Sequence, residues 1–484
     1  MNYKMIFHTM GQTLKILGVL LAVPLLVSII YWEKCAWAFL ITMAICFGAG
    51  FTLTALLKPT SQVFYSREGF IIVALAWVVF SAVGALPFVI SGDIPNYIDA
   101  FFETVSGFST TGSSILADVE KLSRGCLFWR SFTHWIGGMG ILVFVMAITA
   151  KTPDRSIHIL RAEMPGPVVD KLVPRSKDTA KILYLIYIVM TAVLVIMLWA
   201  GGMPFYDSLL HAFGTAGTGG LAIKNDGLAS YGSYAQWVIA VFMFLFGINF
   251  NVYFLIIVKK FKAAFTSEEL WDYVVIAVAC TIAITCNLYQ SSVPLCNNLA
   301  DTFRISAFQV SSIITSTGFT TSNINAWPAF SKSIIFFLMF VGACAGSTGG
   351  GLKISRFIIL LKTVRKQLRT LLHPRSASIV KFEGKRVDDN TLYGITNYFA
   401  VYAGFIIFLF LAVSLFGNLS LEANFSAVVS CFNNMGPAFG EAAANYNCFS
   451  YPAKFILSLA MLFGRLEIYP LLLTLLPNTW LRNR

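Results

Sequence analysis

The sequence predicts an all-α polytopic membrane protein, in which two N-terminal spans precede four similar units of helix, re-entrant loop and helix. Three observations lead to this fold class. The 484 residues are 57% hydrophobic and only 12% charged, whereas an ordinary soluble domain carries about 25% charged residues. Apolar segments of about 20 residues, the length that crosses a bilayer, recur along the chain. Between them, four shorter segments end in glycine-bearing polar strings.

Ten apolar segments are long enough to span. Two come first, near residues 13–32 and 36–57. The others form pairs near 70–91 with 132–150, 181–201 with 235–258, 273–289 with 333–361, and 395–416 with 452–476. We therefore divide the chain into two extra N-terminal helices (1–60) and four pore repeats (61–160, 161–262, 263–386 and 387–484).

Lysine and arginine gather in segments that this arrangement places on one side. They are dense at 151–181 and 362–386, and they recur in KKFK at 259–262 and in LRNR at the end of the chain. Basic loops are typical of the cytoplasmic face, so both termini are expected there. The same loops explain the net charge of +12. No basic patch is interleaved with exposed aromatic residues, so no nucleic-acid partner is expected.

The four enclosed short segments are similar to one another. They read DAFFETVSGFSTTGSS, DSLLHAFGTAGTGGLA, FRISAFQVSSIITSTGFTT and EANFSAVVSCFNNMGPAFG. Their glycines Gly112, Gly220, Gly318 and Gly436 recur at spacings of about 100–120 residues, which indicates an internal repeat. Each segment holds a helix too short to span, so it must enter and leave by the same face. Non-helical backbone at that depth is tolerated only when it is buried in protein or lines a water-filled cavity.

Four such loops around one axis can form a narrow passage lined by main-chain carbonyl oxygens, which replace the hydration shell of an alkali cation. Glycine at the narrowest turn lets the carbonyls converge because it tolerates positive φ. The candidate filter residues are Thr110, Thr111, Gly112, Thr218, Gly219, Gly220, Ser316, Thr317, Gly318, Asn434, Met435 and Gly436. The alternative is that these glycines only allow close helix packing.

Several motifs resemble those of the Trk/Ktr/HKT superfamily of potassium transporters, most closely its bacterial, ten-span Trk members. They are STTGSS, STGFTT, FNNMGPAFG, HWIGGMGILVF (134–144), LRAEMPGP (160–167), GACAGSTGGGLK (342–353) and MLFGRLEIYP (461–470). Leu221 stands where the family usually has an aromatic residue. The resemblance implies potassium uptake across a bacterial inner membrane by a homodimer. It also implies that the basic cytosolic segments dock a TrkA-like nucleotide-binding regulatory ring.

The segment 333–361 would be about 43 Å long as a helix, against a bilayer core of about 30 Å. The small residues that can break it are Ala345, Gly346, Ser347, Thr348, Gly349, Gly350 and Gly351, and the first six of these are the candidate gate residues. The resemblance implies an intramembrane loop that obstructs the pore and moves in gating, with Arg465 beside it. An arginine in an apolar helix is costly and faces the interior or water, where it would repel cations. The alternatives are a kinked helix that never moves, and a structural arginine paired with Glu467 or with carbonyls.

Other classes of function fit less well. Gly346 and Gly351 have P-loop spacing, but Leu352 stands where the lysine belongs, so no nucleotide site is expected. An intramembrane hydrolase using GSTGG would need a paired histidine, and His134 and His211 are more simply polar residues near helix ends. A sodium-permeable pore or an ion-coupled symporter of the same superfamily stays open. Potassium is the expected cargo, and no catalytic residue or organic cofactor is expected.

Overall fold

The computed structural model describes residues 2–58, 66–140, 176–291, 298–375 and 378–480. These residues are mostly helical, as the sequence predicts. The strands in this part of the chain are β1 (Lys381–Phe382) and β2 (Lys385–Arg386), which pair antiparallel with Lys381 opposite Arg386.

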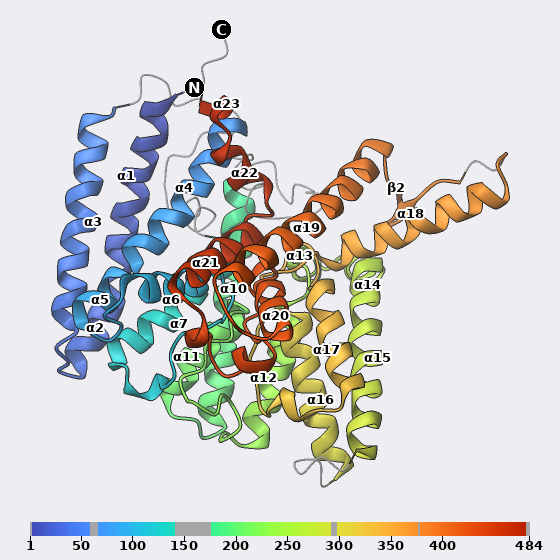
Figure 1. The fold of residues 1–484 in the computed structure, drawn as a ribbon, viewed down its shortest axis with the longest axis horizontal. Coiled ribbons are helices and arrows are strands. Elements are labelled where there is room, and N and C mark those ends of the chain that lie inside the picture. The colour runs from blue at the N-terminus through green and yellow to red at the C-terminus, as the bar shows by residue number, and fades with distance from the viewer. Residues whose placement is uncertain (1, 59–65, 141–175, 292–297, 376–377, 481–484) are drawn as a thin grey trace.

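The N-terminal helices form a hairpin at the edge of the molecule (Figure 1). Helices α1 (Tyr3–Leu20) and α2 (Ala22–Ile30) run one way, and α3 (Ala36–Leu56) returns beside them. Gly11 and Gly50 let the two backbones approach, because a methyl group on Gly11 would lie 3.0 Å from the carbonyl oxygen of Gly50. Close contact through small residues is the usual way in which helices associate in membranes.

The same order of elements then occurs four times, and we call the groups repeats 1 to 4. Repeat 1 holds α4 (Ser66–Gly84), α5 (Leu86–Ser91), α6 (Tyr97–Phe108), η1 (Val119–Lys121) and α7 (Arg124–Gly138). Repeat 2 holds α10 (Ser176–Ala200), α11 (Phe205–Ala216), α12 (Ser233–Phe246), α13 (Phe250–Ile257) and α14 (Phe261–Phe265).

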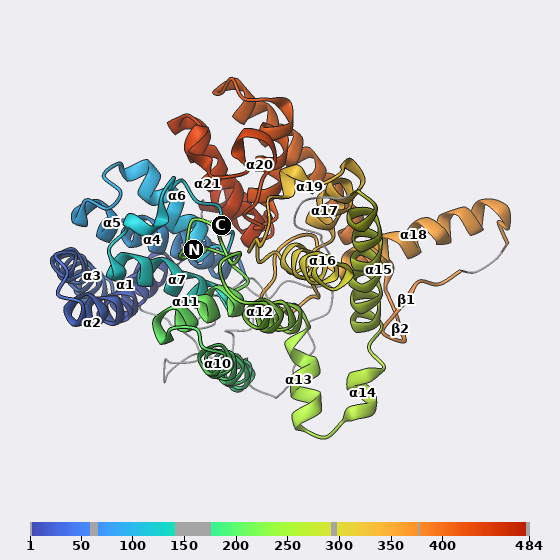
Figure 2. The ribbon, with the colours of Figure 1, turned by 90° about the horizontal axis from the view of Figure 1, so that it is seen from below.

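Repeats 3 and 4 follow the same order. Repeat 3 holds α15 (Glu268–Gln290), α16 (Leu299–Ile314), η2 (Ile324–Ala326), α17 (Ala329–Val341) and α18 (Ile354–Leu372). Repeat 4 holds α19 (Asp389–Leu415), α20 (Leu421–Phe432), η3 (Gly440–Ala442), η4 (Tyr446–Cys448), α21 (Tyr451–Arg465) and α22 (Tyr469–Leu475), and α23 (Pro477–Trp480) ends the described chain. The repeats pass around the centre of the molecule in chain order, with α1–α3 outside repeat 1 (Figure 2).

The first helix of each repeat is continuous, and the second is broken in repeats 2, 3 and 4. By length and composition, six described helices can cross a membrane: Tyr3–Ile30, Ala36–Leu56, Arg67–Ser91, Lys181–Ala200, Glu268–Gln290 and Asp389–Leu415. Helices α12 and α13 would form a seventh span if joined, but they are bent by 89°. The segments expected as spans at 235–258 and 452–476 are each divided into two helices, which the sequence analysis did not anticipate, and the expected break in 333–361 is present. Of the predicted span 132–150, residues 141–150 lie outside the described part of the chain.

The two ends of the described chain lie together. The rings of Tyr3 and Trp480 stack with centroids 6.4 Å apart, and both termini lie at the same end of the molecule (Figure 1). The far end of the N-terminal hairpin contacts the start of α7, where the Glu33 carboxylate accepts the backbone N–H of Arg124 at 2.8 Å. The molecule therefore has one end with the termini and an opposite end with the loops that join α6 to α7.

Candidate functional site

The four short helices α6, α11, α16 and α20 all end in one backbone motif. The second residue after each helix has a positive φ: Thr110 (55°), Thr218 (51°), Ser316 (56°) and Asn434 (53°). The N–H of the next residue then bonds the carbonyl five residues back, from Thr111 to Ser106 (2.9 Å), Gly219 to Gly214 (2.8 Å), Thr317 to Ser312 (2.7 Å) and Met435 to Ser430 (2.9 Å). This is the Schellman motif, which usually has glycine at its left-handed position.

Here the left-handed position is occupied by threonine, serine or asparagine. A non-glycine residue in this conformation costs on the order of 1–3 kcal/mol and persists only where its surroundings fix it. Thr110 and Thr218 are both buried, and β-branched residues are true outliers at positive φ. The same strain at four corresponding places indicates that the backbone after each helix is held in one required shape.

The four glycines two residues further along form a closed ring. Their φ values are 82° for Gly112, 71° for Gly220, 86° for Gly318 and 96° for Gly436. A methyl group on each would approach a carbonyl oxygen of the next repeat, at 2.0 Å (Gly112 to Gly219), 1.8 Å (Gly220 to Thr317), 2.2 Å (Gly318 to Met435) and 2.7 Å (Gly436 to Thr111). The contacts pass from repeat 1 to 2, 3, 4 and back to 1. The structure thus brings all the predicted filter residues together around one axis, with their backbones in contact.

Repeat 2 departs from the others because a histidine lies behind its string. A methyl group on Gly219 would lie 1.5 Å from Nδ1 of His134, which is fully buried. Repeats 1 and 3 have Thr111 and Thr317 at this position, and those side chains have room. His134 therefore explains the extra glycine in repeat 2.

Ser347, the residue that an intramembrane hydrolase would need, instead donates its Oγ to the carbonyl of Cys344 at 2.7 Å.

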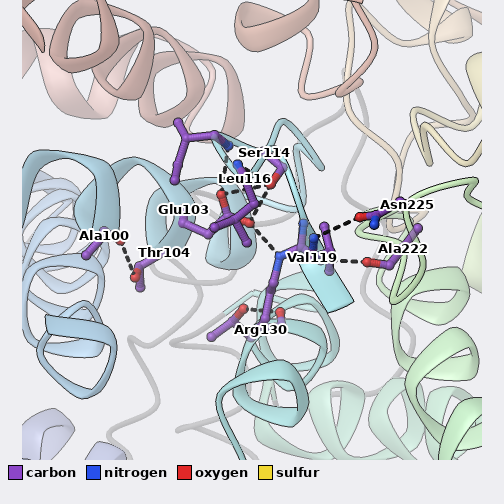
Figure 3. Close-up of polar contacts among 11 residues, drawn as sticks. Ala100, Glu103, Thr104, Ser114, Leu116, Val119, Arg130, Ala222 and Asn225 are labelled. Carbon is purple, nitrogen blue, oxygen red and sulfur yellow. Dashed lines mark hydrogen bonds and ion pairs between the residues drawn. The ribbon is translucent and has the colours of Figure 1, made fainter. Parts of the chain in front are cut away.

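A buried ion pair that the sequence did not point to supports the first two loops (Figure 3). Glu103 of α6 pairs with Arg130 of α7, and the side chains are 0% and 2% exposed. The Glu103 carboxylate also accepts the Ser114 hydroxyl at 3.0 Å and the Ile115 N–H at 3.1 Å. Arg130 donates from Nη1 to the carbonyl of Ala222 at 2.6 Å. The pair thus joins the residues that follow Gly112 to those that follow Gly220.

A wide cavity lies on the side of the ring away from the termini. Its volume is about 680 Å³, and all four glycines of the ring line it. Its rim carries both signs of charge, including Lys224, Asp226 and Glu441. In the described residues there is no group of three or more His, Cys, Asp or Glu side chains that could hold a metal ion.

Helices α7 and α21 pass beneath the ring at glycines. A methyl group on Gly137 would lie 1.8 Å from the carbonyl oxygen of Phe108, and one on Gly464 would lie 1.9 Å from that of Phe432. These carbonyls belong to the last residues of α6 and α20. Any side chain at Gly137 or Gly464 would push a short helix out of place, so the glycines are required by close backbone contact.

The loop between α17 and α18 fills the space under repeats 3 and 4. A methyl group on Gly349 would lie 2.8 Å from the carbonyl oxygen of Thr315, and one on Gly350 would lie 2.5 Å from that of Asn433. Repeat 2 holds the other side of this loop, since Phe250 N–H donates to the Gly346 carbonyl at 3.1 Å. All the predicted gate residues from Ala345 to Gly350 thus lie in one non-helical segment beneath the ring.

Arg465, at the end of α21, binds carbonyls from two other repeats. It donates to Thr348 at 3.0 Å, to Gly137 at 2.5 Å and to Gly138 at 2.8 Å. These carbonyl contacts agree with one form of the structural alternative, in which the arginine binds Glu467 or carbonyls, while Glu467 forms a bidentate pair with Arg356 (2.8 and 2.5 Å). The guanidinium therefore joins the intramembrane loop of repeat 3 to the end of α7 in repeat 1.

The fold and this ring together define a membrane transport protein with re-entrant loops. The chain belongs to the TrkH family, whose description is cation transport protein and whose profile matches residues 36–480. It is a transporter of this family and not an enzyme.

Named relatives cover the whole chain. The Trk system potassium uptake protein TrkH of Salmonella typhimurium is 35% identical over 485 residues, with 99% of this chain and 100% of that protein covered. The Trk system potassium uptake protein TrkG of Escherichia coli is 32% identical, with 98% and 97% covered. The crystal structure of the potassium transporter TrkH from Vibrio parahaemolyticus superposes with a TM-score of 0.90 at 30% identity, covering 99% of this chain and 100% of that one.

Proposed function

We propose that this chain takes up potassium across the bacterial inner membrane through a selectivity filter made of main-chain carbonyl oxygens. The proposal rests on the ring in which each glycine lies against a carbonyl of the next repeat. Such oxygens can replace the hydration shell of an alkali ion. The C-terminal ends of α6, α11, α16 and α20 meet at the same place, and their dipoles favour a cation there. The named relatives are potassium uptake proteins.

The filter residues in this proposal are the four strings 110–112, 218–220, 316–318 and 434–436. The gate is the loop from Ala345 to Gly350 together with Arg465. Two features support the gate. Gly349 and Gly350 lie directly under the strings of repeats 3 and 4, and Arg465 donates to the Thr348 carbonyl within the loop. A cation leaving the ring toward the termini would meet this loop and its arginine.

The proposed orientation places the wide cavity outside the cell and both termini in the cytoplasm. The basic residues of α18, which projects from the half of the molecule that holds the termini (Figure 1), support it through the positive-inside rule. The proposed domains are residues 1–60, 61–160, 161–262, 263–386 and 387–484. The recurring order of elements along the chain supports this division.

We also propose a homodimer, and a cytosolic TrkA-like nucleotide-binding ring as regulator. Helix α18 offers a surface for a partner, since it exposes both apolar and basic residues. The apolar ones are Leu361, Val364, Leu368, Leu371 and Leu372. Residues 151–175 of the other basic segment lie outside the described part of the chain.

Ion flux into liposomes that contain the purified protein tests the proposal. Rubidium, as a potassium substitute, should enter down its own gradient and exceed sodium entry. Flux that requires a second ion gradient would favour a coupled symporter of the same superfamily. Equal sodium and rubidium entry would favour a sodium-permeable pore. No flux of either ion, with or without a cytosolic partner, would contradict the proposal.

A further inference from the structure

One buried cation beneath the ring has no role in the function proposed so far. Lys353 is 2% exposed and immediately precedes α18, with φ 75° and ψ 134°. A lysine gains nothing from this conformation, which is strained for any residue with a Cβ. It must therefore be held by what its backbone and side chain contact.

The lysine ammonium is held by the intramembrane loop. Its Nζ donates to the carbonyl of Gly349. Among the described residues, no ion pair joins Lys353 to a carboxylate. The nearby acid Glu467 is occupied by both nitrogens of the Arg356 fork. The other nearby acid, Glu269, accepts the N–H of Ala345. A buried ammonium without a direct ion-pair partner is costly, so its hydrogen bond to the loop carbonyl offsets part of that cost.

The carbonyl that Lys353 binds belongs to the part of the loop that lies directly against the proposed filter strings. Gly349 lies against the Thr315 carbonyl. The next residue, Gly350, donates its N–H to Oγ of Ser316, which is the left-handed residue of the third string. Lys353 thus binds the loop at Gly349, where this residue and Gly350 contact repeat 3.

The same lysine lines the path beneath the ring. A cavity of about 30 Å³ lies there, bordered by Lys353, Arg465, Gly350 and Asn434. That volume holds little more than a water molecule. A cation that leaves the ring on this side meets a second positive charge in addition to the arginine.

We propose that Lys353 is the latch of the gate: a tethered cation that occupies the Gly349 carbonyl and keeps the loop closed against the third filter string. The inference rests on the proposed function. Ammonium and alkali ions both bind carbonyl oxygens, so the lysine holds a site that an exiting ion would otherwise use. Opening of the pore then requires the Nζ–Gly349 bond to break and the ammonium to move away.

Replacement of the lysine tests the latch. Lys353→Met keeps the length of the side chain and removes the charge and the donor, and it should raise rubidium flux about tenfold or more at unchanged preference over sodium. Lys353→Gln keeps a neutral donor and should raise flux less. Lys15→Met is the matched control, because this half-buried lysine of α1 donates to Oγ1 of Thr54 within the N-terminal hairpin, outside the four repeats. A loss of packing alone would lower flux per folded protein, so an increase separates a latch from a structural lysine.

Three other results have distinct meanings. In the first, both Lys353 variants fold and conduct like the wild type, while deletion of Gly346–Gly350 raises flux. That result refutes the latch role of Lys353 and leaves the loop as the proposed gate. If Lys353→Met does not fold, Lys353→Gln decides, and wild-type flux in that variant refutes the latch. If neither the wild type nor the deletion conducts rubidium, the proposed function itself fails.

Discussion

Alanine substitutions at the four ring glycines should differ in severity, in an order that the structure fixes. The nearest carbonyl oxygen lies 1.8 Å from the methyl position at Gly220, 2.0 Å at Gly112, 2.2 Å at Gly318 and 2.7 Å at Gly436. A Cβ atom almost never approaches another heavy atom below 3.0 Å. All four obstructing atoms are main-chain oxygens, which cannot swing aside as a flexible side chain can. The same oxygens are those proposed to contact the ion.

All four alanine variants have the same backbone cost, that of a positive φ, but they differ in how far the neighbouring carbonyl must move. Each glycine has a φ between 71° and 96°, so alanine costs about 1–2 kcal/mol at every position. The steric displacement differs: at Gly220 the Thr317 carbonyl must move by about 1 Å, whereas at Gly436 a shift of a few tenths of an ångström suffices. We expect Gly436→Ala to reduce discrimination against sodium by about tenfold, which corresponds to about 1.4 kcal/mol. Gly220→Ala should abolish it.

Rubidium and sodium entry into liposomes, measured side by side at equal protein content, gives the comparison. Gly404→Ala is the matched control, because no atom lies within 4 Å of its methyl position. The expected order of selectivity is Gly404→Ala above Gly436→Ala, then Gly318→Ala, Gly112→Ala and Gly220→Ala. The reasoning is wrong if Gly220→Ala keeps wild-type selectivity, or if Gly436→Ala is the most damaging of the four.

Three further predictions follow from the same geometry. Glu103→Gln leaves Arg130 buried without a carboxylate and should lower the free energy of unfolding by about 3–5 kcal/mol. The measurement is the thermal midpoint, and an unchanged midpoint would show that the ion pair does not stabilise the fold. Arg465→Ala, or deletion of Gly346–Gly350, should raise rubidium flux by removing the charge or the obstruction, and wild-type flux in both would exclude them as gates. A cysteine placed next to Trp480 should react with an impermeant thiol reagent only from the cytoplasmic side, and labelling from outside would reverse the proposed orientation.

The sequence predicted the helices that depend on apolar composition and the turns that depend on the backbone conformation of single residues. The apolar lengths predicted the continuous first helices, and the glycine strings predicted the four short helices and their turns. The breaks in α12–α13 and α21–α22 were missed because apolar content dominated the interpretation. Local signals were nevertheless present: Asn249 caps α13 by accepting the Asn251 N–H, and Pro470 lies in the first turn of α22, where proline is favoured.

Contacts between repeats could not be predicted in this way. Glu103 and Arg130 are on different helices, and nothing in their spacing indicates that they meet behind two loops. The extra glycine at position 219 is explained only by the ring of His134, which comes from repeat 1. Such pairs depend on how the repeats pack around the axis, and a single sequence contains no direct record of that packing.

The proposed gate differs from the proposed filter in its symmetry, and this difference has a physical reason. A filter needs one backbone shape four times, because a cation at the centre of the ring would be bound by oxygens from all sides. A gate needs only to obstruct the axis, so one loop is enough, and in our proposal repeat 3 supplies it. The other repeats hold that loop by different means: Arg465 of repeat 4 reaches Thr348, the break after α12 binds Gly346, and the Gly137 carbonyl of repeat 1 receives the same arginine. Each of these contacts is a few hydrogen bonds to a glycine-rich segment, whereas the backbones of the ring are in direct contact. We therefore expect the loop to move in the proposed gating while the ring stays fixed.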